Sequence, residues 1–538
     1  MGHPPTTQSP SPSAQDPATL IRMRRALLAL CLSATCLAQS PQTLTIDAAH
    51  ILGPHTQTPL NTVGAGRANE GLRADWQAQL STLQNEIGFH YIRFHGIFHD
   101  DMGVYTEDSH GTPIYNFQYV DTLYDALLAR HIRPFVELSF MPSALASGPQ
   151  TVFWWKGNIT PPKDMAKWNA LIQAFVTHLQ TRYGADEVNH WYFEVWNEPD
   201  LHDGFFTGSQ ADYFNLYRNT AESIRSVCPH CRVGGPATCC GWETEWLNYI
   251  AQNHVPADFL STHTYGVIKG PFSDHDDGTD LDTSPDSIVG RVRGSRTAID
   301  HSATPHLELH YTEWNSSYTA GDPILDQYIQ APFILSKLRA TSPLAQSMSF
   351  WTFTDIFEEG GPPTRPFHGG FGLITLQGIR KPAYFAYKFL AQLGPSDIAT
   401  TDAASSWATT KPDGSLQILF WNYTPIAPPS NSDDQIFYKL EQPALPAPPT
   451  HLVIDHIPNG RYQLNVYRTG YKQNDAYTAY LHMGSPANLT PAQVEALNQV
   501  ANGAPTETRP ITITNGHFDQ VFPMHQNDTV LTTLTPTH

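Results

Sequence analysis

Basic residues are scarce in this chain. Its 538 residues include 31 Lys and Arg against 50 Asp and Glu, which gives a formal net charge of −19. Beyond residues 22–25, no block of basic residues stands out. Because nucleic-acid-binding domains cluster Lys and Arg on one face, we expect no nucleic acid partner.

Motifs that bind phosphate or activate a serine are also missing. The chain has no P-loop and no dinucleotide fingerprint, and no Gly-x-Ser-x-Gly in the strand–turn–helix context that a serine hydrolase needs. His95 and His263 do not fall in a ligand spacing such as His-x-x-x-His. We therefore expect neither a cofactor nor a metal site.

Residues 23–38 are the apolar segment that bears on localisation. Two arginines precede the apolar core and a small residue stands before Gln39, which is typical of a secretory signal peptide. The segment is too short for an ordinary membrane span, so the mature form is expected to lack one. Residues 1–38 are thus interpreted as an extension plus signal peptide, with translation starting at Met23, and the protein as secreted or periplasmic. The alternative is a buried apolar helix.

Cysteine is rare, with six in the whole chain. The four beyond the predicted signal peptide are Cys228, Cys231, Cys239 and Cys240. In an exported protein, one or two local disulfides are expected. Zinc is the alternative, but the vicinal pair does not match common zinc spacings. A redox role is disfavoured, since no thioredoxin-like βαβ pattern surrounds these residues.

Strand and helix patterns alternate through the first three quarters of the chain, which indicates a parallel sheet. Eight such units over about three hundred residues suit a (β/α)8 TIM barrel, an α/β fold, at residues 39–394. Strands are expected at 62–66, 91–96, 133–140, 191–196, 232–235, 259–265, 307–315 and 348–353. Helices are expected at 74–87, 119–131, 165–183, 213–227, 242–253 and 324–339.

Residues 395–538 differ in character. Short strand patterns separated by turn residues predict an accessory β-sandwich domain. The strands are expected at 415–421, 452–457, 462–467 and 529–534, with one helix at 491–500 capped by Thr490. A leading strand at 42–52 precedes the barrel and is assigned to the barrel region, with membership of the β-domain as the alternative.

Two glutamates stand at the exits of predicted barrel strands. Glu198 follows the apolar run Trp191–Trp196, and Pro199 behind it marks the end of that strand. Glu313 ends the run that starts at Leu307. Chemistry in barrels occurs at the carboxyl ends of the strands. Two carboxylates facing one cleft are what retaining glycoside hydrolysis requires.

The residues around these glutamates resemble glycoside hydrolase family 39, the β-xylosidases and α-L-iduronidases within the large clan of barrel glycosidases. The resemblance rests on Asn197–Leu201, Thr312–Asn315 and Arg93–Gly96. It implies that Glu198 is the general acid/base and Glu313 the nucleophile. It also implies that Asn197 binds the sugar 2-hydroxyl and that Tyr265 donates to Glu313.

Further side chains at strand exits are candidates for substrate contacts. Arg93 is expected to orient the nucleophile by charge-assisted hydrogen bonds. His95 and His263 are expected to hold sugar hydroxyls, with a satisfied structural histidine as the alternative. Trp351 is predicted as a sugar platform. Asp355 and Glu358, just beyond it, are predicted sugar contacts.

The combined prediction is a secreted, retaining, exo-acting β-xylosidase with a small oligosaccharide or glycoside as substrate. An α-L-iduronidase-like enzyme is the alternative, since His202-Asp203 after the acid motif points toward that branch, although no clear cation for a sugar carboxylate is found. A non-catalytic carbohydrate-binding protein on the same scaffold is the third hypothesis. The oligomeric state stays open.

Overall fold

The computed structural model describes residues 40–269, 279–429 and 434–537. The predicted signal peptide at 23–38 lies outside these residues. Within the described residues, no helix is both long and apolar enough to cross a membrane.

Eight parallel strands close into a barrel, which confirms the predicted fold class. Going round the barrel from β10, the order is β10, β11, β14, β15, β2, β3, β6 and β9, and β9 pairs with β10. The strands are β2 (Thr62–Arg67), β3 (Tyr91–His95), β6 (Arg133–Glu137), β9 (Tyr192–Glu194), β10 (Arg232–Thr238), β11 (Phe259–Tyr265), β14 (Glu308–Asn315) and β15 (Ser347–Phe350).

The interior of the barrel is built in layers. Side chains alternate between the two faces of a strand, so Arg93 shares the inner face of β3 with Tyr91, two residues earlier. The aromatic residues Tyr91, Phe135, Tyr192 and Phe259 form a cluster at the amino-terminal end of the strands. Charged residues occupy the next layer, above this aromatic plug. On β3, β6 and β9 the inward-facing charged residues Arg93, Glu137 and Glu194 follow Tyr91, Phe135 and Tyr192 by two residues, so they lie closer to the carboxyl-terminal rim than the aromatic residues do.

Helices surround the barrel, mostly where the apolar spacing predicts them. They are α2 (Thr58–Asn61), α3 (Ala74–Glu86), α4 (Gln118–Leu128), α5 (Met165–Tyr183), α6 (Ala185–Val188), α7 (Gln210–Val227), α8 (Glu243–Asn253), α9 (Val289–Asp300), α10 (Gln330–Thr341) and α11 (Pro382–Leu390). Short hairpins decorate the rim: β4–β5 (Tyr105–Glu107, Pro113–Tyr115), β7–β8 (Thr151–Val152, Gly157–Asn158) and β12–β13 (Val267–Lys269, Asp280–Leu281). Three 3-10 turns complete this part: η1 (Ala68–Leu72), η2 (Asp100–Met102) and η3 (Pro323–Asp326).

The accessory domain is one nine-stranded sheet that curls around its own core. Phe420 on β18 and Phe522 on the edge strand β22 have four strands between them in the sheet order, yet their ring centroids are 5.4 Å apart, so this end of the sheet folds back over its middle as in a sandwich. The strands are β1 (Gln42–Pro54), β16 (Ser396–Thr400), β17 (Ser406–Thr410), β18 (Leu416–Trp421), β19 (Pro446–Asp455), β20 (Gly460–Thr469), β21 (Glu507–Ile513), β22 (His517–His525) and β23 (Thr529–Pro536). The helices are α12 (Asp434–Phe437), α13 (Ala476–His482) and α14 (Pro491–Val500), the last capped by Thr490 as expected.

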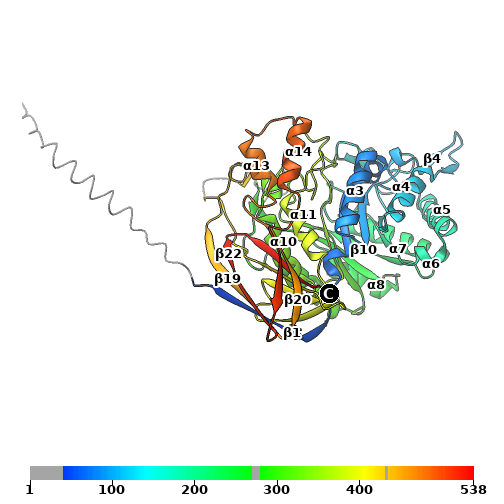
Figure 1. The fold of residues 1–538 in the computed structure, drawn as a ribbon. Helices are drawn as coiled ribbons and strands as arrows, with labels where there is room; N and C mark the ends of the chain where they lie inside the picture. Colours follow the sequence, from blue (N-terminus) through cyan, green and yellow to red (C-terminus); the bar gives the residue numbers. More distant parts are fainter. Residues whose placement is uncertain (1–39, 270–278, 430–433, 538) are drawn as a thin grey trace, which may run out of the picture.

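The leading strand belongs to this sheet rather than to the barrel. β1 pairs antiparallel with β16 and parallel with β19. Figure 1 shows it, in blue, beside the orange and red strands of the carboxyl-terminal region. The amino-terminal segment of the described chain is therefore a central strand of the accessory domain.

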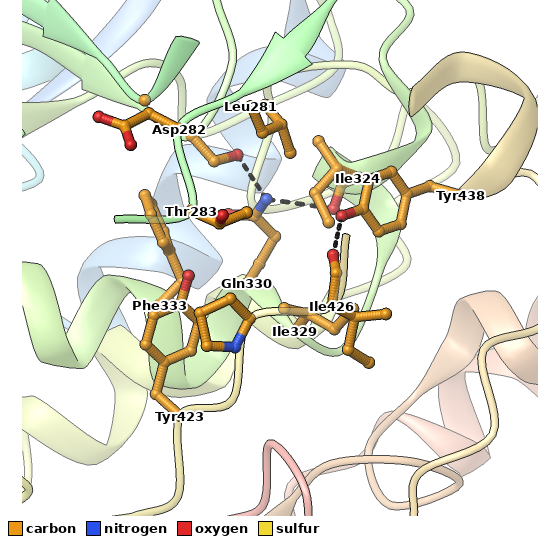
Figure 2. Close-up of a pocket in the computed structure, with 13 residues that line it drawn as sticks. Leu281, Asp282, Thr283, Ile324, Ile329, Gln330, Phe333, Tyr423, Ile426 and Tyr438 are labelled. Carbon is orange, nitrogen blue, oxygen red and sulfur yellow. Dashed lines mark hydrogen bonds between the residues drawn. The ribbon is translucent and has the colours of Figure 1, made fainter. Parts of the chain in front are cut away.

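The barrel and the accessory domain share a packed seam. Trp421 Nε1 on β18 donates to Ser336 Oγ on α10 at 2.8 Å. Figure 2 shows another part of the seam, where Ile426 and Tyr438 face Ile324 and Gln330. The cavity there measures about 30 Å³. That is room for about one water molecule, so this cavity is not a sugar site.

Candidate active site

Glu198 and Glu313 reach the same rim from different strands. Glu313 lies on β14, and Glu198 follows β9 by four residues. The backbone bends sharply before Glu198: Trp196 has φ 74° and Glu198 has φ 42°. Such left-handed conformations are costly for side-chain-bearing residues and cluster at functional sites. Glu198 N–H donates to Ala237 O at 2.8 Å, which ties the bend to the end of β10.

The two carboxyl groups and one imidazole form a compact group. An oxygen of Glu198, a ring nitrogen of His263 and an oxygen of Glu313 all lie within 4.8 Å of one another. Glu198 is 8% exposed, Glu313 is 5% exposed and His263 is 0% exposed. The predicted pair therefore faces one cleft, as the position of both residues at strand exits implies.

Glu313 accepts hydrogen bonds on both carboxylate oxygens. Arg93 Nη1 donates to Oε1 at 2.7 Å, and the Tyr265 hydroxyl donates to Oε2 at 2.7 Å. The resemblance implies the Tyr265 donor, and the Arg93 donor is the charge-assisted hydrogen bond expected from its position at a strand exit. The carboxylate is held on two sides, so its orientation in the cleft is fixed.

Arg93 is fully buried and binds glutamates on β6 and β9. Its Nε contacts Glu194 Oε2 at 2.5 Å, and its Nη2 lies 2.9 Å from Glu137 Oε2. Nη2 also donates to Asn197 Oδ1 at 2.8 Å. That bond fixes the amide orientation of Asn197 and leaves its NH2 group as the donor available to a sugar. The guanidinium thus aligns the nucleophile and Asn197 together.

His95 carries positive charge beside Glu313. Burial lowers its pKa, but Glu137, 2.6 Å from Nδ1, outweighs burial, and the pKa is raised to about 10. The other ring nitrogen, Nε2, lies 3.4 Å from Glu359 and 3.7 Å from Glu313. Together with Arg93, this imidazolium offsets the negative charge of the surrounding glutamates.

Glu198 has the electrostatics of a proton donor. Burial, followed by the nearby negative charge of Asp200, raises the pKa of Glu198 to about 8. The Asp200 carboxylate is held by the backbone N–H groups of Cys239 and Cys240, at 3.1 and 2.7 Å. At neutral pH the Glu198 carboxyl group therefore retains its proton.

His263 supports the acid rather than the sugar. Burial lowers its pKa to about 4, so the ring is neutral. Thr312 Oγ1 donates to Glu194 Oε1 at 2.8 Å, and so accepts from His263 Nε2, which lies 3.2 Å away. In a neutral ring Nδ1 is then the acceptor, and it faces Glu198 Oε1 at 2.7 Å. Both ring nitrogens are occupied, so the prediction that His263 holds a sugar hydroxyl is corrected.

The donor set does not suit a metal ion. Glu198 is protonated and both oxygens of Glu313 face donors. Two cations, Arg93 and His95, already lie beside Glu313. A metal ion bound here would be repelled by the two cations and would displace the hydrogen bonds that Glu313 accepts.

The aromatic and acidic residues after β15 are only partly where the sequence predicts them. The Trp351 ring lies 4.8 Å from the His95 ring and under the Arg93 guanidinium, so it borders the site. Its role as a sugar platform stays a prediction. Asp355 is fully buried and pairs with Lys381 at 2.8 Å, so it presents no exposed oxygen to a sugar. Asp355 as a sugar contact is therefore corrected to a structural ion pair.

Glu358, the predicted sugar contact, lies outside the site, and the next residue, Glu359, which is not predicted, lies in it. Glu358 pairs with Arg67 at 2.9 Å and Arg73 at 3.0 Å, outside the carboxylate group. Glu359 instead lies beside His95, and burial raises its pKa. Adjacent glutamates followed by two glycines are the one signal in the sequence for this residue. They do not indicate which of the two faces the cleft.

Disulfides bracket β10. Cys228 and Cys231 are joined before the strand, and Cys239 and Cys240 are joined directly after it. Cys228 and Cys231 are buried, whereas Cys240 is exposed. The expectation of local disulfides rather than zinc matches this pairing.

A cavity of about 610 Å³ opens beside Glu198. His263, Tyr265 and Glu198 lie at its inner end, and the Cys239–Cys240 pair lines it further out. This volume is in the range of small-molecule sites. Glu198 and Tyr265, which contacts Glu313, thus border a cavity that can hold a saccharide.

Comparison with known proteins agrees with this geometry. The family model described as Glycosyl hydrolases family 39 matches residues 42–517. The chain belongs to glycosyl hydrolases family 39. It is a glycoside hydrolase, and the non-catalytic hypothesis is set aside.

Curated relatives of this family 39 chain include two β-xylosidases. One from Geobacillus stearothermophilus is 43% identical over 370 residues, which cover 67% of this chain and 73% of the relative. One from Caldicellulosiruptor saccharolyticus is 37% identical over 471 residues, covering 84% and 90%. A human α-L-iduronidase is 29% identical over 232 residues, covering 40% of this chain and 33% of that protein.

A solved family 39 structure has the same architecture. The crystal structure of the family 39 enzyme from Xanthomonas axonopodis pv. citri is 45% identical to this chain, with a TM-score of 0.89. The match covers 94% of this chain and 100% of the chain in that crystal structure. The similarity spans both the barrel and the accessory sheet.

Proposed function

We propose that this family 39 hydrolase is a retaining, exo-acting β-xylosidase. Glu198 protonates the leaving oxygen, and Glu313 attacks the anomeric carbon to form a covalent glycosyl–enzyme intermediate. Glu198 then acts as a base toward the incoming water. The observation that carries the proposal is the approach of a Glu198 oxygen to within 4.8 Å of a Glu313 oxygen. Retaining enzymes hold their carboxyl groups about 5–5.5 Å apart, and inverting enzymes about 6.5–9.5 Å.

The electrostatics support the same division of roles. The raised pKa of Glu198 suits an acid that must carry a proton at neutral pH. Two hydrogen-bond donors hold the Glu313 carboxylate, which suits a nucleophile that must stay charged. The retaining mechanism therefore needs no rearrangement of the side chains around the pair.

Exo action is supported by contacts on the His95 side of the cleft. Phe153 stacks on the His95 ring with 5.8 Å between the ring centroids. The backbone N–H of the next residue, Trp154, donates to the backbone oxygen of Glu359 at 2.7 Å. This bond joins the loop after β6 to the loop after β15. A cleft bridged at one end accepts the terminal sugar of a chain rather than its middle.

Xylose is the sugar favoured by the relatives, because the two β-xylosidases match more of the chain at higher identity than the iduronidase does. An α-L-iduronidase-like activity remains the second candidate. It needs a cation for the sugar carboxylate, and the cations at the pair, Arg93 and His95, are engaged by glutamates.

A panel of aryl glycosides tests the proposal: β-xyloside, β-glucoside, β-galactoside, α-arabinoside and α-iduronide. We expect the highest kcat/KM on the β-xyloside, with β-xylose as the first product seen by ¹H NMR. Initial release of α-xylose would mean inversion and would refute the assignment of Glu313 as a nucleophile. Preferential cleavage of the iduronide would replace the proposed sugar.

We further propose export from the cytoplasm. The signal-like segment 23–38 and two disulfides both fit an oxidising compartment. Amino-terminal sequencing of the protein from the culture medium or the periplasm is expected to find a start near residue 39. An exported chain that still carries residues 1–22 would contradict this proposal.

A further inference from the structure

The cavity beside Glu198 extends away from the nucleophile. Its lining includes Glu198 and His263 at the inner end, then Leu201, Val267, Ile288 and the Cys239–Cys240 disulfide. In the proposed mechanism the acid stands on the leaving-group side of the bond that breaks. The part of the cavity beyond Glu198 therefore faces the leaving group.

The disulfide turn and the acid form one rigid body. The Asp200 carboxylate, two residues after Glu198, accepts the backbone N–H groups of Cys239 and Cys240. Glu198 N–H in turn donates to Ala237 O, two residues before Cys239. Contacts on both sides fix the distance between the sulfur atoms and the acid.

The lining suits a sugar ring. Cys239 is half-buried and Cys240 is exposed, so the disulfide presents an apolar, polarisable surface to the cavity. Arg291 Nη2 donates to Cys239 O at 3.3 Å, and Arg291 lines the cavity beside Asp282 and Asp286. Apolar surface with polar side chains at its border is what the faces and hydroxyl edges of a sugar require.

A second cavity continues the groove. It measures about 260 Å³ and shares Gly290 and Arg291 with the first, leading between α8 and α9. The groove therefore has room for more than one sugar beyond the acid.

We propose that the Cys239–Cys240 disulfide is the wall of the leaving-group subsite and recognises the sugar ring of a neutral xylo-oligosaccharide, whose further units follow the groove past Gly290. This inference rests on the proposed function, since it needs Glu198 as the acid. In this proposal the disulfide determines which leaving group the enzyme prefers, a role that none of the catalytic residues has.

The test compares leaving groups. β-D-Xylosyl fluoride releases a single atom that needs no proton, whereas xylobiose places a sugar against the disulfide. In Cys239→Ala/Cys240→Ala we expect kcat/KM on xylobiose to fall by about tenfold or more, the size of a lost apolar contact in a pocket. On the fluoride we expect a change of less than about twofold.

The matched control is Cys228→Ala/Cys231→Ala, which removes the buried disulfide at the other end of the same strand. We expect this variant to treat both substrates like the wild type. An equal loss on both substrates in the Cys239–Cys240 variant would overturn the proposal, because it would mean damage to the fold or to the nucleophile side of the site, which both substrates use, rather than loss of a leaving-group contact. Wild-type kcat/KM on both substrates would overturn it as well.

Gly290→Leu tests the groove without touching the disulfide. A Cβ at Gly290 would meet its nearest atom, Asp286 Oδ2, at 3.4 Å, so α9 can accept a side chain there. We expect kcat/KM on xylotetraose to fall relative to xylosyl fluoride, and an unchanged ratio would overturn the groove. If the wild type cleaves no xyloside at all, the proposed function fails, which is a separate outcome.

Discussion

At the residue scale, Glu198 and Glu313 differ in what surrounds them. Glu198 is buried beside a neutral imidazole and near Asp200, so its pKa is raised to about 8. Glu313 faces a guanidinium, an imidazolium and a phenol. Two identical side chains therefore receive the two roles of the proposed reaction from their environments.

Chemical rescue distinguishes these roles. In Glu198→Ala we expect turnover of xylobiose to fall by about 10²–10⁴-fold, the usual contribution of a general acid/base. Added azide should restore activity on an activated aryl xyloside and give β-xylosyl azide. In Glu313→Ala, azide should occupy the place of the nucleophile and give α-xylosyl azide. ¹H NMR of the products is the measurement.

The control for both variants is Glu245→Ala, a change at an exposed position on α8. It should keep normal turnover and show no response to azide. If Glu313→Ala keeps near-normal activity without azide, Glu313 is not the nucleophile.

The pH profile reports the proton on Glu198. Below about pH 8 the acid is protonated and can donate, and above it the proton is lost. We expect kcat/KM on xylobiose to decline on the alkaline side, with an apparent pKa near 8 for the free enzyme. Asp200→Asn removes a negative charge that raises this pKa, so the alkaline limb should move to lower pH.

Asp203→Asn is the matched control for the profile. Asp203 is 73% exposed and pairs with His202 at the surface, so its loss should leave the limb in place. If Asp200→Asn leaves the alkaline limb unchanged, Asp200 does not set the proton affinity of the acid.

At the element scale, a buried ion-pair group joins three segments behind the site. Lys381, at the start of α11, lies 2.7 Å from Asp326 in η3 and 2.8 Å from Asp355 after β15. All three side chains are at most 1% exposed. Burial lowers the pKa of Lys381, but the two aspartates outweigh it and hold the amine charged. This group fixes the loop that carries Glu358 and Glu359.

Lys381→Ala should therefore be strongly destabilising. It leaves two carboxylates buried without their cation, which costs about 3–5 kcal/mol in comparable pairs. Lys388→Ala, on the same helix but in a partly exposed pair with Glu86, should cost at most about 1 kcal/mol. Urea unfolding followed by tryptophan fluorescence measures both. Equal midpoints for the two variants would contradict this account.

The elements that the sequence predicts are those with a clear period. The helix expected at 165–183 is α5, and the strand exits at Glu198 and Glu313 are where the apolar runs indicate. Besides the short helices α2, α6, α12 and α13, two longer helices of the barrel region, α9 and α11, are not predicted. α9 contains Gly290 and Gly294 and has a thin apolar stripe. α11 is buried almost all round, so it has no polar face to reveal a helical period.

The site is predicted less completely than the barrel, for a related reason. Strand-exit position predicts the carboxylate pair, Arg93 and Tyr265. It does not predict which partner a side chain meets across the barrel, so it fails for His263, Asp355 and Glu358. The place of the Cys239–Cys240 disulfide in the cleft depends on Asp200, 39 residues away in sequence. Local pattern contains no information on such contacts.

At the scale of the whole molecule, the first described strand holds the accessory domain together. β1 is hydrogen-bonded on both edges, to β16 and β19. Its Leu44 and Ile46 are buried in the core of the sheet at 4% and 0% exposure. Without β1, the sheet would split into two parts with open edges. Unpaired edges of this kind promote aggregation.

Two truncations separate this strand from the segment before it. A chain that starts at Ser40 retains all of β1 and should be soluble, folded and as active as the exported protein. A chain that starts at Thr56 loses β1, and we expect it to aggregate or to lose a cooperative unfolding transition, even though every residue of the carboxylate pair is present. Size-exclusion chromatography and thermal unfolding measure the difference. If the shorter chain is monomeric, stable and fully active, the accessory sheet does not depend on β1, and the barrel folds without an intact accessory sheet.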